Sequence, residues 1–248
     1  MSKSVLHEAY NTLVTKGRLK PNPNQASLVD RLATLQSQLT TANTSRLSNG
    51  LPGVYIHGSV GTGKSRIADL FAATLPSQIS VRRTHFHEFM LDIHKRLHTS
   101  RSASDFRGDP LLRIGHDISA ENKVLCFDEF QVSDIADAMI LKRLFSGVWA
   151  GGGVMVSTSN REPDRLYENG LNRQLFLPFI EDLKRKCEVW KLQGEEDYRM
   201  SLTSERDEIF FTDSAAFEAA LEKDTNGEAP HPLSIKVMMN RVLQVQAY

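Results

Sequence analysis

The most informative stretch of the chain is residues 58–65, which read Gly58-Ser59-Val60-Gly61-Thr62-Gly63-Lys64-Ser65. This stretch fits the pattern G-x-x-x-x-G-K-[ST] at every fixed position. Glycines allow consecutive backbone N–H groups to curl around a phosphate, and a helix starting at Lys64 adds the positive end of its dipole. We expect all eight residues to bind ATP, with Lys64 neutralising the β and γ phosphates and the Ser65 hydroxyl ligating Mg²⁺.

Short apolar runs alternate with helical patterns on both sides of this loop. The predicted strands are Val54–His57, Val81–Phe86, Val124–Phe127, Val154–Thr158 and Glu188–Leu192. The predicted helices are Ile67–Leu75, Glu88–His98, Asp134–Trp149 and Arg173–Lys186. Strands and helices in alternation indicate a parallel sheet joined by right-handed crossovers. The sequence therefore predicts an α/β P-loop NTPase fold with a five-stranded parallel sheet flanked by helices.

Two acids, Asp128 and Glu129, end the apolar run that starts at Val124. At the carboxyl edge of a parallel sheet, such acids face the ligand crevice. We expect Asp128 to hold Mg²⁺ and Glu129 to polarise the attacking water. Taken alone, the pair is equally typical of a solvated acidic turn, and the phosphate loop favours the catalytic interpretation. The base-reading motif N-K-x-D does not occur in the chain, which favours ATP over GTP.

Two further residues are candidates for catalysis. Asn160 follows the predicted strand Val154–Thr158, which we place between the two motif strands, where a polar side chain could orient water against the γ-phosphate. Arg173 precedes an apolar helix, at the point where AAA+ rings supply an arginine to the neighbouring subunit's nucleotide. Arg161 and Arg165 are its competitors, and an ordinary surface arginine is the alternative.

Composition gives no global signal for a nucleic-acid or membrane partner, although local basic patches remain possible. Lys+Arg and Asp+Glu both number 30 among 248 residues, so no global charge indicates nucleic acid or an anionic membrane. The basic clusters Lys142-Arg143 and Lys184-Arg185-Lys186 are short, and no apolar run approaches the roughly 18 residues of a membrane helix. Two cysteines in apolar surroundings, and no signal peptide or basic presequence in the first residues, favour a reducing, intracellular compartment.

The chain is expected to have three parts. Residues 1–48 form an N-terminal helical segment, residues 49–202 the ATPase core, and residues 203–248 an irregular segment with a hairpin. In the first part, Leu28, Leu32, Leu35 and Leu39 recur at helical spacing, and Asn24 is the expected N-cap. In the last part we expect a strand over Glu208–Phe211, a helix over Ser214–Leu221, and a hairpin turning near Asn240-Arg241. Four histidines, His85, His87, His94 and His98, are interpreted as polar residues near the sheet edge rather than metal ligands.

Long signature stretches resemble one AAA+ group, the AFG-one-like ATPases, also called the lactation-elevated or ZapE-type family. Besides the phosphate loop, the matching stretches are His85–Met90, Leu125–Met139, Thr158–Arg161, Gly170–Arg173, Phe176–Ile180 and Asp197–Arg199. The similarity covers roughly residues 8 to 200 and is far more specific than a phosphate loop alone.

This resemblance implies a homo-oligomeric AAA+ ring acting on protein clients. Eukaryotic members are mitochondrial, often tied to the inner membrane, and help to remove surplus respiratory-chain subunits, whereas bacterial relatives associate with the division machinery. Family members also carry a basic presequence and a helical lid, so the resemblance implies a member whose lid is missing or incomplete. A location in the cytoplasm is the alternative to mitochondria. We expect loss of the lid to weaken hydrolysis more than phosphate binding.

Three functions remain open from the sequence. The first is a remodelling or quality-control ATPase for membrane or respiratory-chain proteins. The second is a nucleic-acid helicase loader, for which a basic stripe with interleaved aromatic residues would be evidence. The third is a nucleotide-gated adaptor that does not hydrolyse ATP. The polar stretch Ser100–Gly108 is a candidate for gripping a substrate at a central pore.

Overall fold

A computed structural model describes residues 4–41, 50–102, 108–192, 231–237 and 241–247. The chain divides into two compact units, Met1–Ser201 and Leu202–Tyr248. The predicted domain boundaries at residues 48 and 202 stay a prediction. Among the described residues, no helix combines the length and apolar character that crossing a bilayer requires.

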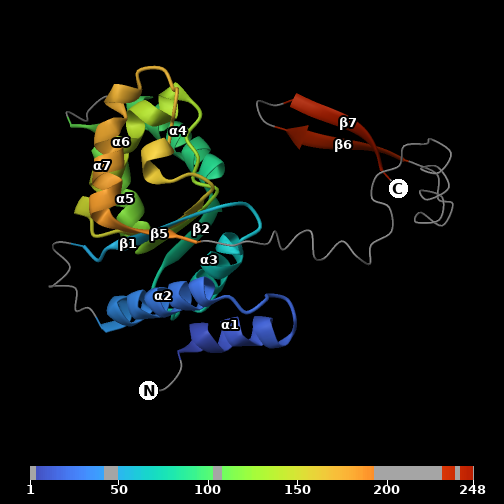
Figure 1. Ribbon diagram of the computed structural model, residues 1–248. Coiled ribbons are helices and arrows are strands. Elements are labelled where there is room, and N and C mark those ends of the chain that lie inside the picture. Colours follow the sequence, from blue (N-terminus) through green and yellow to red (C-terminus); the bar gives the residue numbers. More distant parts are fainter. Residues whose placement is uncertain (1–3, 42–49, 103–107, 193–230, 238–240, 248) are drawn as a thin grey trace. The chain divides into compact units, whose positions relative to one another are not determined.

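The first unit is built on a five-stranded sheet in which every neighbouring pair is parallel (Figure 1). The strand order is β2-β3-β4-β1-β5, so β4 lies between β1 and β3, as the sequence predicts. The strands are β1 (Gly53–His57), β2 (Val81–His85), β3 (Val124–Asp128), β4 (Val154–Ser159) and β5 (Cys187–Lys191). The predicted five-stranded parallel sheet is therefore confirmed.

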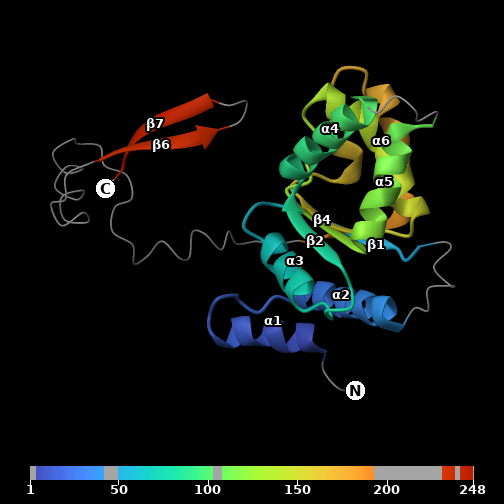
Figure 2. The same cartoon turned by 180° about the vertical axis from the view of Figure 1, so that it is seen from behind.

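Helices cover both faces of this sheet, as the two opposite views show (Figures 1 and 2). One face carries α1 (Val5–Thr15), α2 (Pro23–Thr41) and α3 (Lys64–Ala73). The other face carries α4 (Phe86–Ser102), α5 (Pro110–Glu121), α6 (Ile135–Ala150) and α7 (Leu177–Lys186). Two 3-10 turns, Pro163–Arg165 and Arg173–Leu175, lie between β4 and α7.

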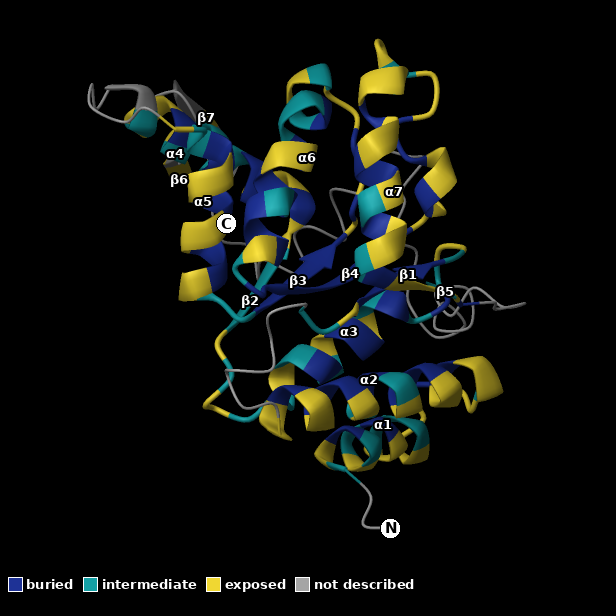
Figure 3. Cartoon of the chain, turned by 90° about the vertical axis from the view of Figure 1, so that its left-hand side faces the viewer, coloured by how far each residue is buried: buried dark blue, intermediate teal, exposed yellow. Residues whose placement is uncertain are grey.

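Side chains alternate between the two faces of the strands, and this alternation gives the sheet two hydrophobic cores. In β3, Leu125 and Phe127 join the core beneath α4 to α7, whereas Val124 and Cys126 join the core beneath α1 to α3. All these side chains are almost fully buried, and Figure 3 shows the central strands β1, β3 and β4 buried between helices whose outer faces are exposed. The apolar runs in the sequence follow from this burial on both faces.

Helix α5 has no counterpart among the predicted elements. Its start is set by Asp109, whose side-chain Oδ1 accepts a hydrogen bond of 3.0 Å from the Leu111 backbone N–H, and by Pro110 in the first turn. Ile114 and Ile118 are buried against the core. Aspartate, proline and an apolar i, i+4 pair together are a helix signal, so this element was predictable.

Two other boundaries differ from the expected ones. The N-cap of α2 is Asn22, because its Oδ1 accepts hydrogen bonds from the backbone N–H groups of Asn24 (2.8 Å) and Gln25 (3.3 Å). The prediction of Asn24 as the cap is wrong, since Pro23 occupies the first helical position. The predicted helix Arg173–Lys186 is also divided, because Pro178 has no N–H to continue it and α7 begins only at Leu177.

The second unit contains an antiparallel hairpin of β6 (His231–Val237) and β7 (Arg241–Ala247). This confirms the predicted hairpin. The expected strand Glu208–Phe211 and helix Ser214–Leu221 lie outside the described residues. So does most of the stretch Ser100–Gly108, whose first residues end α4.

Candidate active site

The phosphate loop joins the end of β1 to the start of α3, as its sequence predicts. Gly61 and Gly63 have backbone φ angles of 82° and 86°, a left-handed conformation that favours glycine. Gly58 is fixed for another reason: a Cβ there would lie 2.2 Å from the Leu192 carbonyl oxygen. Leu192 is the first residue after β5, and its backbone N–H donates a hydrogen bond of 2.7 Å to the His57 carbonyl oxygen at the end of β1.

Lys64 is buried within the loop that it ends. Its ammonium donates hydrogen bonds to the carbonyl oxygens of Gly58 (2.8 Å) and Ser59 (2.6 Å). The Thr62 hydroxyl donates to the same Ser59 carbonyl at 3.0 Å. These bonds hold the positive charge against the loop, and the first N–H groups of α3 have no partner within the helix. The loop therefore presents a cation and backbone donors together, which is the donor set that a phosphate requires.

Ser65 and Asp128, the two residues predicted to hold Mg²⁺, are in direct contact. The Ser65 hydroxyl donates to Asp128 Oδ1 at 2.7 Å, although the residues are far apart in sequence. The Thr158 hydroxyl of β4 also donates to Oδ1. A carboxylate and a hydroxyl at this position are the hard oxygen ligands that Mg²⁺ prefers, so the residues present fit the ion.

Arg83 of β2 holds the second oxygen of Asp128. Its Nη2 lies 3.1 Å from Asp128 Oδ2 and 2.7 Å from Asp69 Oδ1 of α3. Burial raises the pKa of the Asp128 carboxyl, but hydrogen bonds from Thr158, Ser65 and Arg83 outweigh burial and bring the pKa below its ordinary value. Asp128 is therefore held as a carboxylate beside the phosphate loop.

Glu129 and Asn160, the predicted base and water-orienting residue, follow neighbouring strands at the carboxyl edge of the sheet. Glu129 comes directly after β3 and has a φ angle of 53°, which is unusual for a residue other than glycine. Its backbone N–H donates to the Thr158 hydroxyl at 3.2 Å, and its side chain is exposed. Asn160 comes directly after β4 and is also exposed. Both are at the same edge as the phosphate loop, where a nucleotide would meet them.

Arg173, the remaining predicted site residue, lies between β4 and α7. It lies in the 3-10 turn Arg173–Leu175, and its Nη2 donates to the Asp164 carbonyl oxygen. Its Nε is buried and has no hydrogen-bond partner among the described residues. The neighbouring Leu171 and Leu175 are 70% and 59% exposed. The predicted role of Arg173 is at a neighbouring subunit's nucleotide, and that role stays a prediction.

Three residues of the site are missing from the sequence-based assignment: Gln25, Arg83 and Thr158. The hydroxyl of Thr158 and the guanidinium of Arg83 both contact Asp128, but strand residues carry no signal of which neighbour they meet. Gln25 had a signal. It lies three residues before Leu28 on the buried stripe of α2, where a polar side chain needs a buried partner.

A glycine-rich loop after β1, acids at the end of β3 and this strand order together define the P-loop NTPase fold of the AAA+ type. The fold is similar to that of DnaA from Aquifex aeolicus with bound AMPPCP, with a TM-score of 0.52, 12% sequence identity, and coverage of 85% of this chain and 55% of that chain. At this identity the similarity concerns the fold alone.

The chain belongs to the AFG1-like ATPase family, whose model matches residues 4–247. It is 46% identical over 154 residues to the lactation elevated protein 1 homolog B of Danio rerio, covering 59% of this chain and 30% of that protein. It is also 46% identical over 148 residues to the cell division protein ZapE of Escherichia coli K12, covering 60% of this chain and 38% of that protein. The matched region is therefore less than half the length of these relatives.

Proposed function

We propose that the chain binds Mg²⁺-ATP at the phosphate loop and hydrolyses it. The observation that carries this proposal is the 2.7 Å hydrogen bond between the Ser65 hydroxyl and Asp128 Oδ1. It joins the two motifs at one point, and the same edge of the sheet carries the buried Lys64 and the exposed Glu129 and Asn160. Membership of an ATPase family supports the same activity.

In this mechanism the residues 58–65 bind the phosphates through backbone N–H groups and the Lys64 ammonium. Ser65 and Asp128 would hold Mg²⁺, which when bound would neutralise charge that develops on the phosphate oxygens. Glu129 polarises the attacking water, and Asn160 orients that water by hydrogen bonding. Asp128 is buried and bonded to Ser65 and Thr158, whereas the Glu129 side chain is exposed, so we assign the two acids separate tasks.

The proposal extends to a homo-oligomeric ring in which Arg173 reaches the nucleotide of a neighbouring subunit. Three features of the 171–175 segment support an interface there. Leu171 and Leu175 expose apolar surface, and the buried Nε of Arg173 has no hydrogen-bond partner among the described residues. An arginine in that place would stabilise charge in the transition state.

For the biological role, we propose remodelling or quality control of membrane or respiratory-chain proteins in mitochondria. This part rests on family membership alone. It is tested by locating the full-length protein in cells. The levels of respiratory-chain subunits are also compared between cells that carry the wild-type protein and cells that carry the Glu129→Gln variant.

The activity is tested with two variants and a control. Lys64→Ala removes the phosphate cation and is expected to weaken ATP affinity by about 100-fold, whereas Glu129→Gln is expected to keep affinity and lower turnover by about 100-fold or more. Lys142→Ala, an exposed lysine on α6, is the charge-matched control. Affinity is measured by calorimetry and turnover by phosphate release. If Lys64→Ala binds ATP as tightly as the control, the proposed site is wrong. If wild type binds ATP without turnover, the chain is a nucleotide-gated adaptor instead.

A further inference from the structure

A buried glutamine links the N-terminal helices to the phosphate loop. Gln25 of α2 has no exposed surface, and its side-chain Nε2 donates a hydrogen bond of 2.9 Å to the carbonyl oxygen of Thr62. The hydroxyl of Tyr10 in α1 donates to Gln25 Oε1 at 3.3 Å. Helix α1, helix α2 and the loop are thus joined in one buried hydrogen-bonded chain.

The position of this contact within the loop gives it a consequence for phosphate binding. A trans peptide unit is planar, and its carbonyl and N–H groups point in opposite directions. Because the Thr62 carbonyl points to Gln25, the N–H of Gly63 in the same peptide unit points away from α2. The left-handed φ of 86° at Gly63 keeps this peptide orientation next to Lys64.

Close packing at Gly63 holds the same peptide against the N-terminal helices. A Cβ built on Gly63 would lie 2.9 Å from Gln25 Nε2 and 3.7 Å from a methyl carbon of Leu19. Leu19 is itself buried, in the segment between α1 and α2. The loop therefore lies directly against the N-terminal helical layer, with no space for a side chain between them.

We propose that Gln25 is a positioning residue that turns the Gly63 N–H toward the bound phosphates, with Tyr10 holding the Gln25 amide in the required orientation. This inference rests on the proposed binding of ATP at residues 58–65. It adds that the first two helices form part of the nucleotide site, although neither contains a residue of the phosphate-loop motif.

The kinetic signature distinguishes this role from a general loss of structure. The Gly63 N–H contacts a phosphate both in the bound substrate and in the transition state. Losing its orientation therefore weakens the binding of both states by the same amount. Uniform binding affects KM and leaves kcat nearly unchanged. A residue that only stabilises the fold would leave the KM of the folded fraction unaltered.

The same helix provides a matched control, Gln36. It is also buried, and its Nε2 donates to the Phe71 carbonyl oxygen (3.1 Å) and the Thr74 hydroxyl (2.8 Å) at the far end of α3. Gln36→Ala and Gln25→Ala thus remove the same group from the same helix. Only one of them disturbs the phosphate loop.

The experiment measures ATP affinity by calorimetry, steady-state KM and kcat, and urea unfolding for Gln25→Ala, Gln25→Glu and Gln36→Ala. Gln25→Glu keeps the shape and the acceptor for Tyr10 but replaces the donor to Thr62 with an acceptor. We expect both Gln25 variants to bind ATP about tenfold more weakly, with kcat within about twofold of wild type. Gln36→Ala is expected to lose similar stability and keep wild-type affinity.

Two results would overturn the inference, and they differ from each other. If wild type binds ATP and the Gln25 variants bind as tightly as Gln36→Ala, Gln25 does not position the loop. If wild type binds no ATP, the proposed function fails and the inference fails with it. If a Gln25 variant does not fold, Tyr10→Phe supplies the test, because it frees the Gln25 amide without removing it and should raise KM in the same direction.

Discussion

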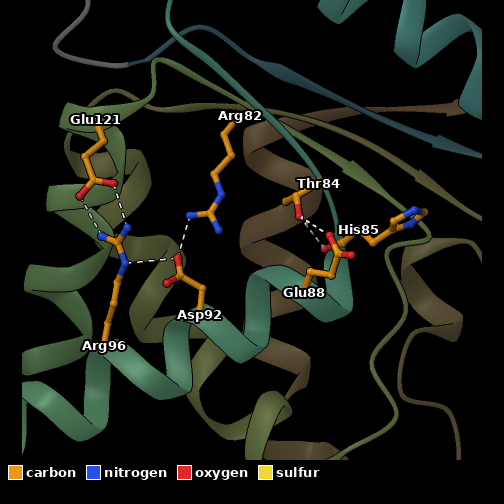
Figure 4. Close-up of polar contacts among 7 residues, drawn as sticks. All are labelled: Arg82, Thr84, His85, Glu88, Asp92, Arg96 and Glu121. Carbon is orange, nitrogen blue, oxygen red and sulfur yellow. Dashed lines mark hydrogen bonds and ion pairs between the residues drawn. The ribbon is translucent and has the colours of Figure 1, made fainter. Parts of the chain in front are cut away.

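Replacing Arg96 with methionine should destabilise the first unit more than replacing a comparable surface arginine. Arg96 of α4 donates two hydrogen bonds to the Glu121 carboxylate of α5, at 2.8 and 2.9 Å, and a third from Nε to Asp92 Oδ2 at 3.2 Å (Figure 4). Arg82 of β2 donates to the same Asp92 oxygen at 2.8 Å. The network therefore ties α5 to α4, and α4 to the edge strand of the sheet.

The size of the effect follows from the exposure of these groups. The side chains of Arg96 and Asp92 are 31% and 30% exposed and that of Glu121 is 47% exposed, so solvent screens the network only in part. Exposed ion pairs contribute up to about 1 kcal/mol to the free energy of unfolding, and bidentate, partly buried pairs lie at the upper end of this range. Methionine keeps the aliphatic bulk of Arg96, so we expect a loss of about 1–2 kcal/mol at pH 7.

The pH dependence of this loss is a second, independent test. The hydrogen bond from Arg96 lowers the pKa of the Glu121 carboxyl. For Asp92, burial raises the pKa of the carboxyl, but Arg82 and Arg96 lower it by more, so the pKa of Asp92 is also below its ordinary value. A carboxyl whose pKa is lowered in the folded state stabilises the fold above its unfolded pKa and loses that contribution as pH falls through the folded pKa. The loss caused by Arg96→Met should therefore shrink below about pH 4.

The assay is urea unfolding followed by tryptophan fluorescence, because both tryptophans, Trp149 and Trp190, belong to the first unit. The control is Arg113→Met. Arg113 pairs with Asp117 over 3.8 Å within α5 alone, with both side chains more than half exposed, and its replacement should lose about 0.3 kcal/mol or less. Equal losses in the two variants, or a loss from Arg96→Met that is the same at pH 3 and pH 7, would refute the reasoning.

Three further predictions concern the core, the site and the thiols. Gly115→Ala should destabilise the chain by about 1–3 kcal/mol in urea unfolding despite the better helix propensity of alanine, because its Cβ would lie 2.1 Å from the Leu144 carbonyl oxygen; unchanged stability would contradict this packing. Asn160→Ala should lower turnover at least tenfold with unchanged ATP affinity, and equal turnover would remove Asn160 from the mechanism. Burial raises the pKa of Cys126 and Cys187 to about 12, so a thiol reagent at pH 8 should label neither in the folded chain and both in urea; rapid labelling without urea would show that one is accessible.

The sheet was predictable because its three central strands, β1, β3 and β4, are buried on both faces and so give compact apolar runs. The edge strands β2 and β5 are partly exposed and give a weaker pattern, and the helices between the strands indicate a parallel order. Helix boundaries were less predictable, since they depend on single capping groups. Asn22 and Asn24 are the same residue type two positions apart, and only the placement of Pro23 in the first turn decides which one caps α2.

The motif residues of the site were predictable because phosphate and metal chemistry demand particular side chains at fixed spacing. The supporting residues were not, because their roles arise from register between strands. Arg83 contacts Asp128 only because β2 pairs with β3 so that Arg83 lies opposite Cys126, two residues before Asp128. Thr158 contacts Asp128 because β4 is the other neighbour of β3. No local pattern in the sequence specifies either register.

The dependence of the loop on the N-terminal layer links folding of that layer to nucleotide binding. The core beneath α3 includes fully buried leucines of α1 and α2, namely Leu6, Leu28 and Leu32, together with Ile67 of α3. The position of α3, which starts at the phosphate loop, therefore depends on packing against the two N-terminal helices. A ligand that binds only the folded loop stabilises whatever must be folded for binding. Protection of α1 and α2 from hydrogen exchange should therefore rise when ATP is added, to the same extent as protection of α3, and by less in Gln25→Ala. Protection confined to α3 would separate the N-terminal layer from the site.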